Sequence, residues 1–323
     1  MTTPHISVVT PVYGYQLDLP ALYQRLCAAI TPITPHFEII MVNDQSPDNA
    51  WQVIQELAAR DQRVRGINLS RNFGQHQAIT AGLEFVRGDW CVIMDCDLQD
   101  QPEEIPKLYA KAQEGFDSVV GMRVQRKDDL SVRITSKLFY KLFNYLTDQE
   151  LDHRVANFGV YSRRVIDAVK RYKEAGRSVG LLLLQVGFPR CQIEIQHAQR
   201  EVGSSTYTFK KRLQTAQSHI LSYSTKPLQL VVKTGFFVVS FSFFLAVYFI
   251  FRYLKWGSET PGWTSLIVVL LFLSGLLISV VGIIGLYVGQ IYNEVKNRPL
   301  FLVAETTFAV QSIVNQQNGE KIF

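Results

Sequence analysis

The sequence predicts an α/β fold built on a mostly parallel sheet, followed by two membrane-spanning helices. Up to residue 122, short apolar runs alternate with helical patterns of about ten residues, as expected of strands joined by helical crossovers. Each apolar run ends in polar residues, which is where such sheets place their ligands. Two almost entirely apolar runs follow, at 228–253 and 263–291, and each is long enough to cross a bilayer core of about 30 Å.

The predicted strands and helices alternate along the chain. Ile6 to Val12 is a mostly apolar run typical of a buried parallel strand, and the apolar spacing from Leu19 to Ile30 predicts a helix. Right-handed crossovers would bring the successive strands into parallel register. Further strands are expected at 37–42, 64–69 and 90–94, and each is followed by a helix, at 50–60, 75–86 and 103–114 respectively. A fifth strand at 118–122 and another α/β segment at 157–196 follow.

An acidic stretch follows the fourth predicted strand. Asp95 and Asp97 end the apolar run that begins at Cys91, and Gln99 stands just beyond them. Acids two apart on an extended chain share a face, so this pair can bind one hard divalent cation through oxygen while a substrate diphosphate fills the remaining positions. For a lone Asp-x-Asp, an acidic turn that caps the next helix is the simpler interpretation. The other strand ends favour a nucleotide-diphosphate site here.

Those other strand ends carry side chains that suit a nucleotide. Asp44 follows the second strand, where a carboxylate can accept a hydrogen bond from a base or ribose, or instead cap the following helix. Arg71 follows the third strand, where a guanidinium can meet a phosphate or stack on a base. Arg123 ends the fifth strand, Arg200 lies in a later polar segment, and both are candidates for holding phosphate oxygens.

Missing motifs exclude several classes of protein. Gly14 is the only glycine directly after the first strand, so the glycine-rich loops of dinucleotide oxidoreductases and P-loop ATPases are absent. The six histidines show no zinc spacing, and no nucleophile elbow is present. The net charge of +5, without a long basic tail, suits an anionic membrane surface better than DNA, so no nucleic-acid partner is expected.

Two amphipathic segments are expected to lie in a membrane interface. In the first, at about 130–146, apolar residues recur every four positions beside a basic stripe of Arg133, Lys137 and Lys141. A cationic face on an ordinary packed helix is the alternative interpretation of this pattern. The second segment, at 206–226, mixes aromatic and basic residues and leads into the first apolar run.

Loop charges predict the orientation of the two spans. The link between them carries one lysine, whereas both flanking sides are rich in Lys and Arg, which places both sides in the cytoplasm. The N-terminus also lacks the basic start and apolar core of a signal peptide. We therefore expect a multi-pass protein of the inner (plasma) membrane. Its parts are a cytoplasmic globular domain at 1–226, two spans within 227–292 and a cytoplasmic tail at 293–323.

Taken together, these motifs resemble those of family 2 glycosyltransferases, in the same order along the chain. The end of the second span looks like that of the family's two-span polyprenyl-phosphate branch, and the resemblance covers nearly the whole chain. Within that branch the chain is most similar to bactoprenol glucosyltransferases, with dolichol-phosphate mannose synthases as relatives. The motifs are Thr10-Pro11-Val12-Tyr13, Asn43-Asp44-x-Ser46-x-Asp48, Leu69-Ser70-Arg71-Asn72-Phe73-Gly74, Asp95-x-Asp97-Leu98-Gln99-Asp100-x-Pro102, Gly121-x-Arg123 and the segment from Gly282 to Pro299.

The resemblance implies a type A glycosyltransferase fold, a nucleotide-sugar donor, a polyprenyl phosphate acceptor, and Mg²⁺ or Mn²⁺. It also implies a homo-oligomer, a tetramer, in contact with membrane lipid. The catalytic residues would be Asp95, Asp97, Arg123 and Arg200. The nucleotide would contact Pro11, Tyr13, Asp44, Arg71, Asn72 and Asp95. The metal ion would be held by Asp95, Asp97 and Gln99. The acceptor phosphate would face Arg133, Ser136, Lys137, Arg200 and Ser205.

Three positions depart from the family pattern. Gln45 replaces the glycine that usually follows Asp44, and the stretch around Ser205 lacks a lysine that relatives carry. Asn157 stands where many relatives have an acid, which leaves no evident general base at that position. A polyprenyl phosphate does not need one, because its second pKa lies near 6 and it is largely dianionic at neutral pH.

The sequence therefore predicts inverting transfer of glucose from UDP-glucose to undecaprenyl phosphate at the cytoplasmic face of the membrane. Within the same class, the alternative is a polyprenyl- or dolichol-phosphate mannose synthase that uses GDP-mannose. Outside it, the alternative is a non-catalytic membrane adaptor or flippase that binds nucleotide sugars. The intact acidic pair argues against a silent adaptor, and two spans are few for a translocation path. No single residue identifies the sugar.

Overall fold

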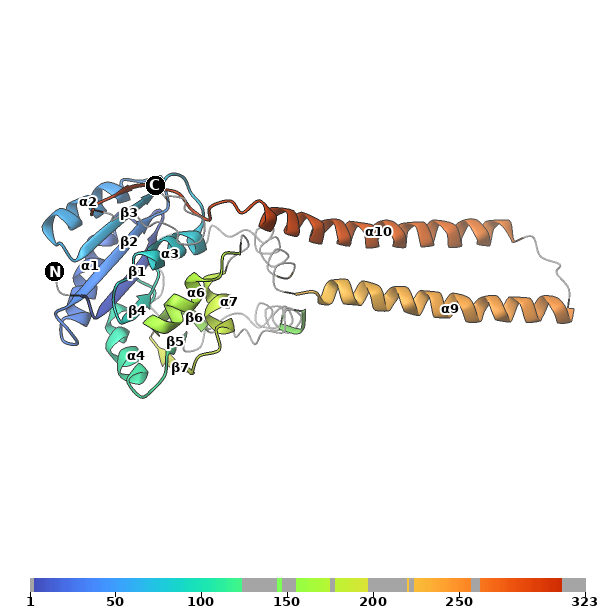
Figure 1. Cartoon of the computed structure of the whole chain (residues 1–323), viewed down its shortest axis with the longest axis horizontal. Helices are drawn as coiled ribbons and strands as arrows, with labels where there is room; N and C mark the ends of the chain where they lie inside the picture. The colour runs from blue at the N-terminus through green and yellow to red at the C-terminus, as the bar shows by residue number, and fades with distance from the viewer. Residues whose placement is uncertain are drawn as a thin grey trace. The chain divides into compact units, whose positions relative to one another are not determined.

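The computed structural model describes residues 3–123, 144–146, 155–174, 178–196, 220, 224–256 and 262–309 (Figure 1). The chain divides into two compact units. The first comprises residues 1–134, 151–206 and 298–323 and contains the sheet, whereas the second comprises residues 135–150 and 207–297 and contains two long helices.

The described part of the first unit contains an eight-stranded sheet with the order β7-β5-β6-β4-β1-β2-β3-β8 (Figure 1). Strand β1 pairs in parallel with β2 and β4, and β2 with β3, whereas β6 and β8 run antiparallel to their neighbours. The predicted α/β class with a mostly parallel sheet is therefore confirmed. The strands are β1 (Ile6–Val12), β2 (Phe37–Asn43), β3 (Val64–Leu69), β4 (Trp90–Ile93), β5 (Ser118–Arg123), β6 (Val155–Ser162), β7 (Arg190–Ile195) and β8 (Val303–Thr306).

Helices cover the sheet. Every residue of β1 and β2 is buried, as expected for parallel strands with both faces covered. Helix α3 lies close to β1 because Gly82 has no side chain; a Cβ there would lie 2.5 Å from Val9 Cγ1. The helices of this unit are α1 (Leu19–Ile30), α2 (Ala50–Arg60), α3 (Gln75–Glu84), α4 (Ile105–Ala112), α6 (Arg163–Lys170) and α7 (Val179–Gln185), with a 3₁₀ turn at Pro102–Glu104.

In the sheet unit, the observed bounds follow the predicted ones within one or two residues, except at the predicted helix 103–114. Here the chain forms the 3₁₀ turn Pro102–Glu104 and then the shorter helix α4. Pro106 lies in the first turn of α4, where its missing N–H costs no hydrogen bond but where it cannot continue an earlier helix. The proline separates one predicted helix into two elements.

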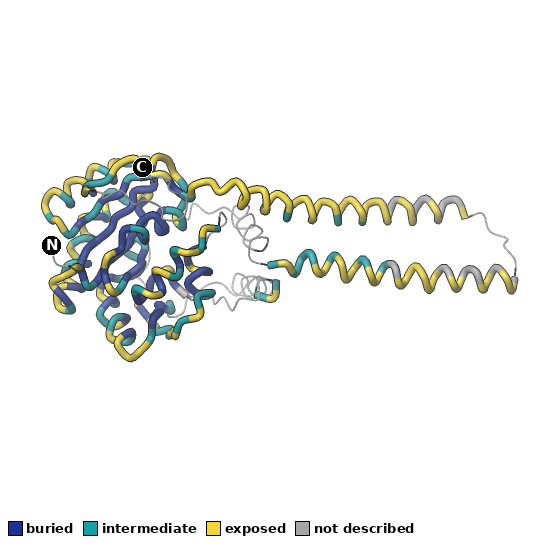
Figure 2. Tube along the Cα trace, in the orientation of Figure 1, coloured by how far each residue is buried: buried dark blue, intermediate teal, exposed yellow. Residues whose placement is uncertain are grey.

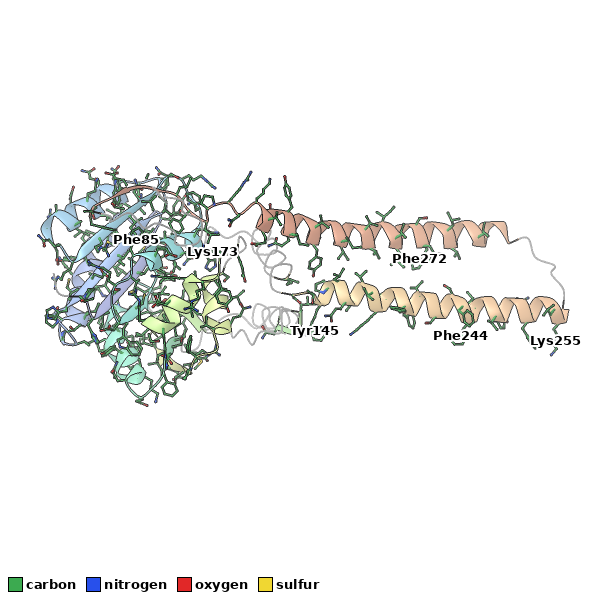
Figure 3. All side chains as sticks on the ribbon, in the orientation of Figure 1. Phe85, Tyr145, Lys173, Phe244, Lys255 and Phe272 are labelled. Atoms are coloured by element: carbon green, nitrogen blue, oxygen red, sulfur yellow. The ribbon has the colours of Figure 1, made fainter. Side chains whose placement is uncertain are left out.

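The second unit contains helices α9 (Lys226–Trp256) and α10 (Trp263–Val295), which include the two predicted spans. Their described side chains are largely exposed (Figure 2), as Phe244 on α9 and Phe272 on α10 illustrate (Figure 3). Within the described residues, the stretches Lys226–Leu245 and Phe272–Val295 are long and apolar enough to cross a membrane. The predicted interfacial segments at 130–146 and 206–226 lie almost wholly outside the described residues.

The chain returns to the sheet after α10. Strand β8 pairs antiparallel with β3, and the Ser70 backbone N–H donates to the Leu302 carbonyl at 2.9 Å (Figure 1). Strand β8 lies in the tail at 293–323, for which no strand or helix was predicted. The segments before α9 and after α10 therefore belong to one folded unit.

Candidate active site

Five strand ends meet at one edge of the sheet. Strands β4, β1, β2 and β3 are parallel neighbours, and β5 has the same direction because both β4 and β5 run antiparallel to β6. Their carboxyl ends therefore share an edge. The structure thus brings the predicted strand-end residues to this edge: Tyr13, Asp44, Arg71, Asn72, Asp95 and Arg123.

The loops after β1 and β2 are tied to each other. The Gly14 N–H donates to Ser46 Oγ at 2.7 Å, and the Ser46 hydroxyl donates to Asp48 Oδ1 at 2.5 Å. Asp48 Oδ2 accepts the Gln16 N–H at 2.9 Å. Tyr13, which begins the tied loop, is 50% exposed, so its ring face is available at this edge. The predicted contact residue Pro11 is buried within β1.

Asp44 anchors the loop that follows β3. Its Oδ1 accepts the Phe73 N–H at 2.7 Å and its Oδ2 the Gly74 N–H at 2.8 Å. Burial raises the pKa of Asp44, and the two backbone donors and the charge of Arg71 act in the opposite direction. Asp44 therefore does not cap α2, and the N–H of Ala50, the first residue of that helix, donates instead to Asp48 Oδ1 at 3.2 Å.

Gln45, the departure from the family's glycine, adopts a φ of +50°. This left-handed conformation is the one that glycine adopts without steric cost. The turn after Asp44 is therefore of the kind that glycine favours, and Gln45 holds it with some backbone strain.

Arg71 and Asn72 lie exposed in the loop that Asp44 anchors. The Arg71 guanidinium stacks 4.1 Å from the centroid of the Phe73 ring, and its Nη1 donates to the Asn72 carbonyl at 3.3 Å. These contacts are local to the loop. They leave the outer face of the guanidinium at the surface of the edge.

Asp95 is the electrostatic centre of the edge. Its Oδ1 accepts a hydrogen bond from Gln75 Nε2 at 2.6 Å. Burial is the main reason that the pKa of Asp95 rises to about 7, and the negative charges of Asp100 and Asp97 raise it further, while Gln75 and Arg123 lower it. The protein alone therefore leaves an excess of negative charge at this point.

Asp97 and Gln99 lie in a strained turn beyond Asp95. The Gln99 N–H donates to Asp97 Oδ1 at 3.1 Å, and Leu98 between them has a φ of +57°. A branched residue in this conformation costs about 1 to 2 kcal/mol, and such strain recurs at ligand sites.

The donor set at this turn suits a hard cation. Asp95, Asp97 and Gln99 offer only oxygen ligands, as Mg²⁺ and Mn²⁺ prefer, and the surplus negative charge at Asp95 would be neutralised by a bound cation. In the part of the chain that the structure describes, no three His, Cys, Asp or Glu residues gather as a metal-binding group. A cation here would thus need further oxygens from a substrate.

Arg123 belongs to the same cluster. Its Nη2 lies 3.4 and 3.5 Å from the two carboxylate oxygens of Asp100, which is only 1% exposed. Two partners in this cluster, Asp100 and Gln75, were not among the predicted site residues. Asp100 stands within the quoted acidic motif, and Gln75 directly follows the predicted loop of β3, so their positions carried a signal.

The predicted acceptor side is not described. Arg133, Ser136, Lys137, Arg200 and Ser205 lie outside the described residues. Asn157 is exposed on β6, next to the fully buried Phe158. The roles of these residues remain predictions.

The pKa of Asp95 has a consequence for stability. An ordinary aspartate has a pKa near 4, so between about pH 4 and 7 the folded protein binds more protons than the unfolded chain, and metal-free stability falls as pH rises through this window. Asp95→Asn removes the penalty. We expect its melting temperature with a chelator to exceed that of the unaltered protein by about 3 °C at pH 8 and by much less at pH 5. An equal difference at both pH values would contradict the assignment.

Comparison with known proteins shows the family. Residues 7–170 match the family described as Glycosyl transferase family 2. The chain belongs to this family. As a family 2 glycosyltransferase it is an enzyme, and its mostly parallel sheet confirms the expected type A fold.

Relatives of this family 2 glycosyltransferase align over almost the whole chain. It is 35% identical to the SfII prophage-derived bactoprenol glucosyl transferase of Shigella flexneri, across 93% of this chain and 98% of that protein. It is 36% identical to the undecaprenyl-phosphate 4-deoxy-4-formamido-L-arabinose transferase of Shewanella sediminis, across 93% and 92%. Among solved structures, glucosyl-3-phosphoglycerate synthase of Mycobacterium tuberculosis with Mn²⁺ and UDP aligns at a TM-score of 0.48, across 68% and 78%, with 17% identity.

Proposed function

We propose that this family 2 glycosyltransferase transfers a sugar from a nucleotide-diphosphate sugar to a polyprenyl phosphate. More specifically, we propose that it transfers glucose from UDP-glucose to undecaprenyl phosphate. The observation that carries the proposal is the end-to-end similarity to a bactoprenol glucosyl transferase. The 36% identity to a formamido-arabinose transferase supports a second candidate function, in which another sugar is transferred to the same lipid. A GDP-mannose donor is a further alternative for the sugar.

The donor would lie along the edge formed by β1 to β4. Tyr13 offers an exposed ring for the base, and Arg71 and Asn72 offer a cation and an amide beside it. Asp95, Asp97 and Gln99 would hold Mg²⁺ or Mn²⁺ against the diphosphate. When bound, that cation supplies positive charge to the departing diphosphate. Arg123, oriented by Asp100, would stabilise the same charge.

The acceptor would attack directly. One oxygen of the dianionic lipid phosphate forms a bond to the anomeric carbon while the bond from that carbon to the diphosphate oxygen breaks, so an α-linked donor gives a β-linked product. No proton has to be removed, which is compatible with Asn157 in place of an acid. Arg133, Ser136, Lys137, Arg200 and Ser205 are proposed to hold the acceptor. The main task of the protein is alignment of the two reactants.

We propose a membrane location in which both flanks of the two apolar helices lie on one side. Strand β8, made after α10, lies in the sheet formed by residues before α9. If the two apolar helices cross a bilayer, both flanking segments lie on the same face, and the excess of Lys and Arg in these flanks supports a cytoplasmic face. Assembly into a tetramer remains a prediction from the resemblance.

The test is a transfer assay with purified full-length protein, undecaprenyl phosphate and a panel of labelled UDP- and GDP-sugars, with and without a chelator. We expect label from UDP-glucose in the lipid phase, and its loss on chelation. Label from GDP-mannose or another donor alone would replace the sugar assignment. Glycans longer than one sugar would indicate a processive synthase, and no label from any donor would refute the proposal.

A further inference from the structure

The segment after α10, residues 301–308, forms a strap along the outer edge of β3. Phe301 is buried, and β8 pairs with β3 in antiparallel register. The Leu302 carbonyl accepts the Ser70 N–H at 2.9 Å, one residue beyond the end of β3. Ser70 begins the loop to α3, so the strap holds the first residue of that loop.

Side chains fix the strap on α2. Glu305 Oε2 accepts from Trp51 Nε1 at 2.9 Å, and Glu305 Oε1 accepts from Gln55 Nε2 at 3.1 Å. Both carboxylate oxygens are thus used by one helix. These two hydrogen bonds fix the register of the strap along β3 and also hold the strap against the protein.

The far end of the strap is fixed on the sheet. The Gly66 N–H donates to Thr307 Oγ1 at 2.8 Å, and the Thr307 N–H donates to the Gly66 carbonyl at 3.0 Å. A Cβ at Gly66 would lie 2.8 Å from Thr307 Cγ2, so glycine permits this approach. The Phe308 ring lies 3.8 Å from the Arg65 guanidinium carbon and packs edge-on against Phe85.

The loop that begins at Ser70 is therefore held at both ends. The strap holds its first residue, and Asp44 accepts the Phe73 and Gly74 N–H groups at its last two. Arg71 and Asn72 lie between the two anchors, exposed at the candidate donor edge.

We propose that the strap is a positioning element for the loop Ser70–Gly74, so that affinity for the nucleotide-sugar donor depends on the segment that follows the second apolar helix. This inference rests on the proposed function, in which Arg71 and Asn72 contact the nucleotide. A loop fixed at both ends loses less conformational freedom when it binds a ligand, and binding is tighter for that reason. Release of the first anchor removes part of this advantage.

The competing interpretation is that the strap only covers the edge of β3. An uncovered edge strand invites pairing with other chains, and a short covering strand prevents it. In that case the loss of the strap's contacts lowers stability without any selective effect on the donor. Donor affinity therefore separates the two interpretations.

The test compares full-length variants in the transfer assay. Glu305→Ala, Thr307→Val and Phe308→Ala together remove the side-chain anchors of the strap, and Phe308→Ala alone is the milder variant if the triple one does not fold. Phe308→Tyr keeps the stacking on Arg65, and Ala304→Ser changes an exposed residue of the same strand as a matched control. The kinetic constants for donor and lipid acceptor are measured with the melting temperature of each variant, and UDP affinity is measured by calorimetry with Mn²⁺.

We expect the triple variant to raise the donor KM by about five- to tenfold, with kcat and the acceptor KM within twofold, and both control variants to match the unaltered protein. An unchanged donor KM with a lower melting temperature would overturn the proposal in favour of simple edge cover. A fall in kcat alone would also overturn it. If the unaltered protein transfers no sugar, the proposed function is wrong. The role of the strap is then tested by UDP binding alone, and equal UDP affinities of the unaltered protein and the triple variant would refute it.

Discussion

Asp97→Asn is expected to reduce sugar transfer by at least about 10³-fold, with little change in folding. The substitution keeps the size of the side chain but removes one of the two charged oxygen ligands proposed for the cation. A factor of 10³ corresponds to about 4 kcal/mol of lost transition-state stabilisation, which is within the range for charge stabilisation by a metal ion. The measurement is kcat at saturating donor and Mn²⁺.

Asp89→Asn is the matched control for Asp97→Asn. Asp89 precedes β4, whereas Asp97 follows it, so the control acid lies at the opposite edge of the sheet, where it pairs with His5. Its side chain is 73% exposed, and its loss is expected to leave transfer unchanged. Retention of more than a tenth of the activity by a double Asp95→Asn and Asp97→Asn variant would remove the metal assignment.

Glu38→Ala is expected to destabilise the protein by about 3 to 5 kcal/mol, which corresponds to roughly a 10 °C fall in melting temperature. Glu38 is 1% exposed and accepts from Ser7 Oγ at 2.6 Å, Arg65 Nη1 at 3.0 Å and Arg87 Nη2 at 2.6 Å. Its loss leaves the mostly buried Arg65 side chain without a carboxylate partner. Thermal unfolding in detergent measures the effect.

Glu103→Ala gives the comparison for Glu38→Ala. Glu103 forms a two-pronged ion pair with Arg25, but its side chain is 52% exposed, so we expect a loss below about 1 kcal/mol. Equal effects of the two substitutions would show that burial does not determine the strength of the Glu38 network. Activity per folded molecule should survive in both variants, because Glu38 lies near the start of β2, away from the strand ends of the candidate site.

The sequence predicts the elements of the sheet and the edge where the site lies. Mostly apolar runs such as Ile6 to Val12 identify buried strands, and neighbouring parallel strands place their carboxyl ends at the same edge of the sheet. This is why Asp44, Arg71 and Asp95 could be assigned to one edge without knowledge of the strand order.

Contacts between distant segments could not be predicted in the same way. Strand β8 is four residues long, and the short apolar run at 300–304 contributes only the first two residues of the strand, so its pairing with a strand more than 230 residues earlier could not be predicted from this pattern. The hydrogen bond from Gln75 to Asp95 joins the first residue of α3 to the loop after β4, so it depends on the register of that helix. The role of Asp44 as a loop anchor rather than a cap of α2 likewise depends on the path of the chain after β3.

The position of β8 has a consequence for biosynthesis. Because this strand is translated after both apolar helices, the edge of β3 lacks it on the nascent chain until the ribosome has passed residue 306. Sheet edges left open during synthesis are the surfaces on which nascent chains misassemble. The sheet formed by the N-terminal half is therefore completed only after the segment 301–308 has emerged from the ribosome.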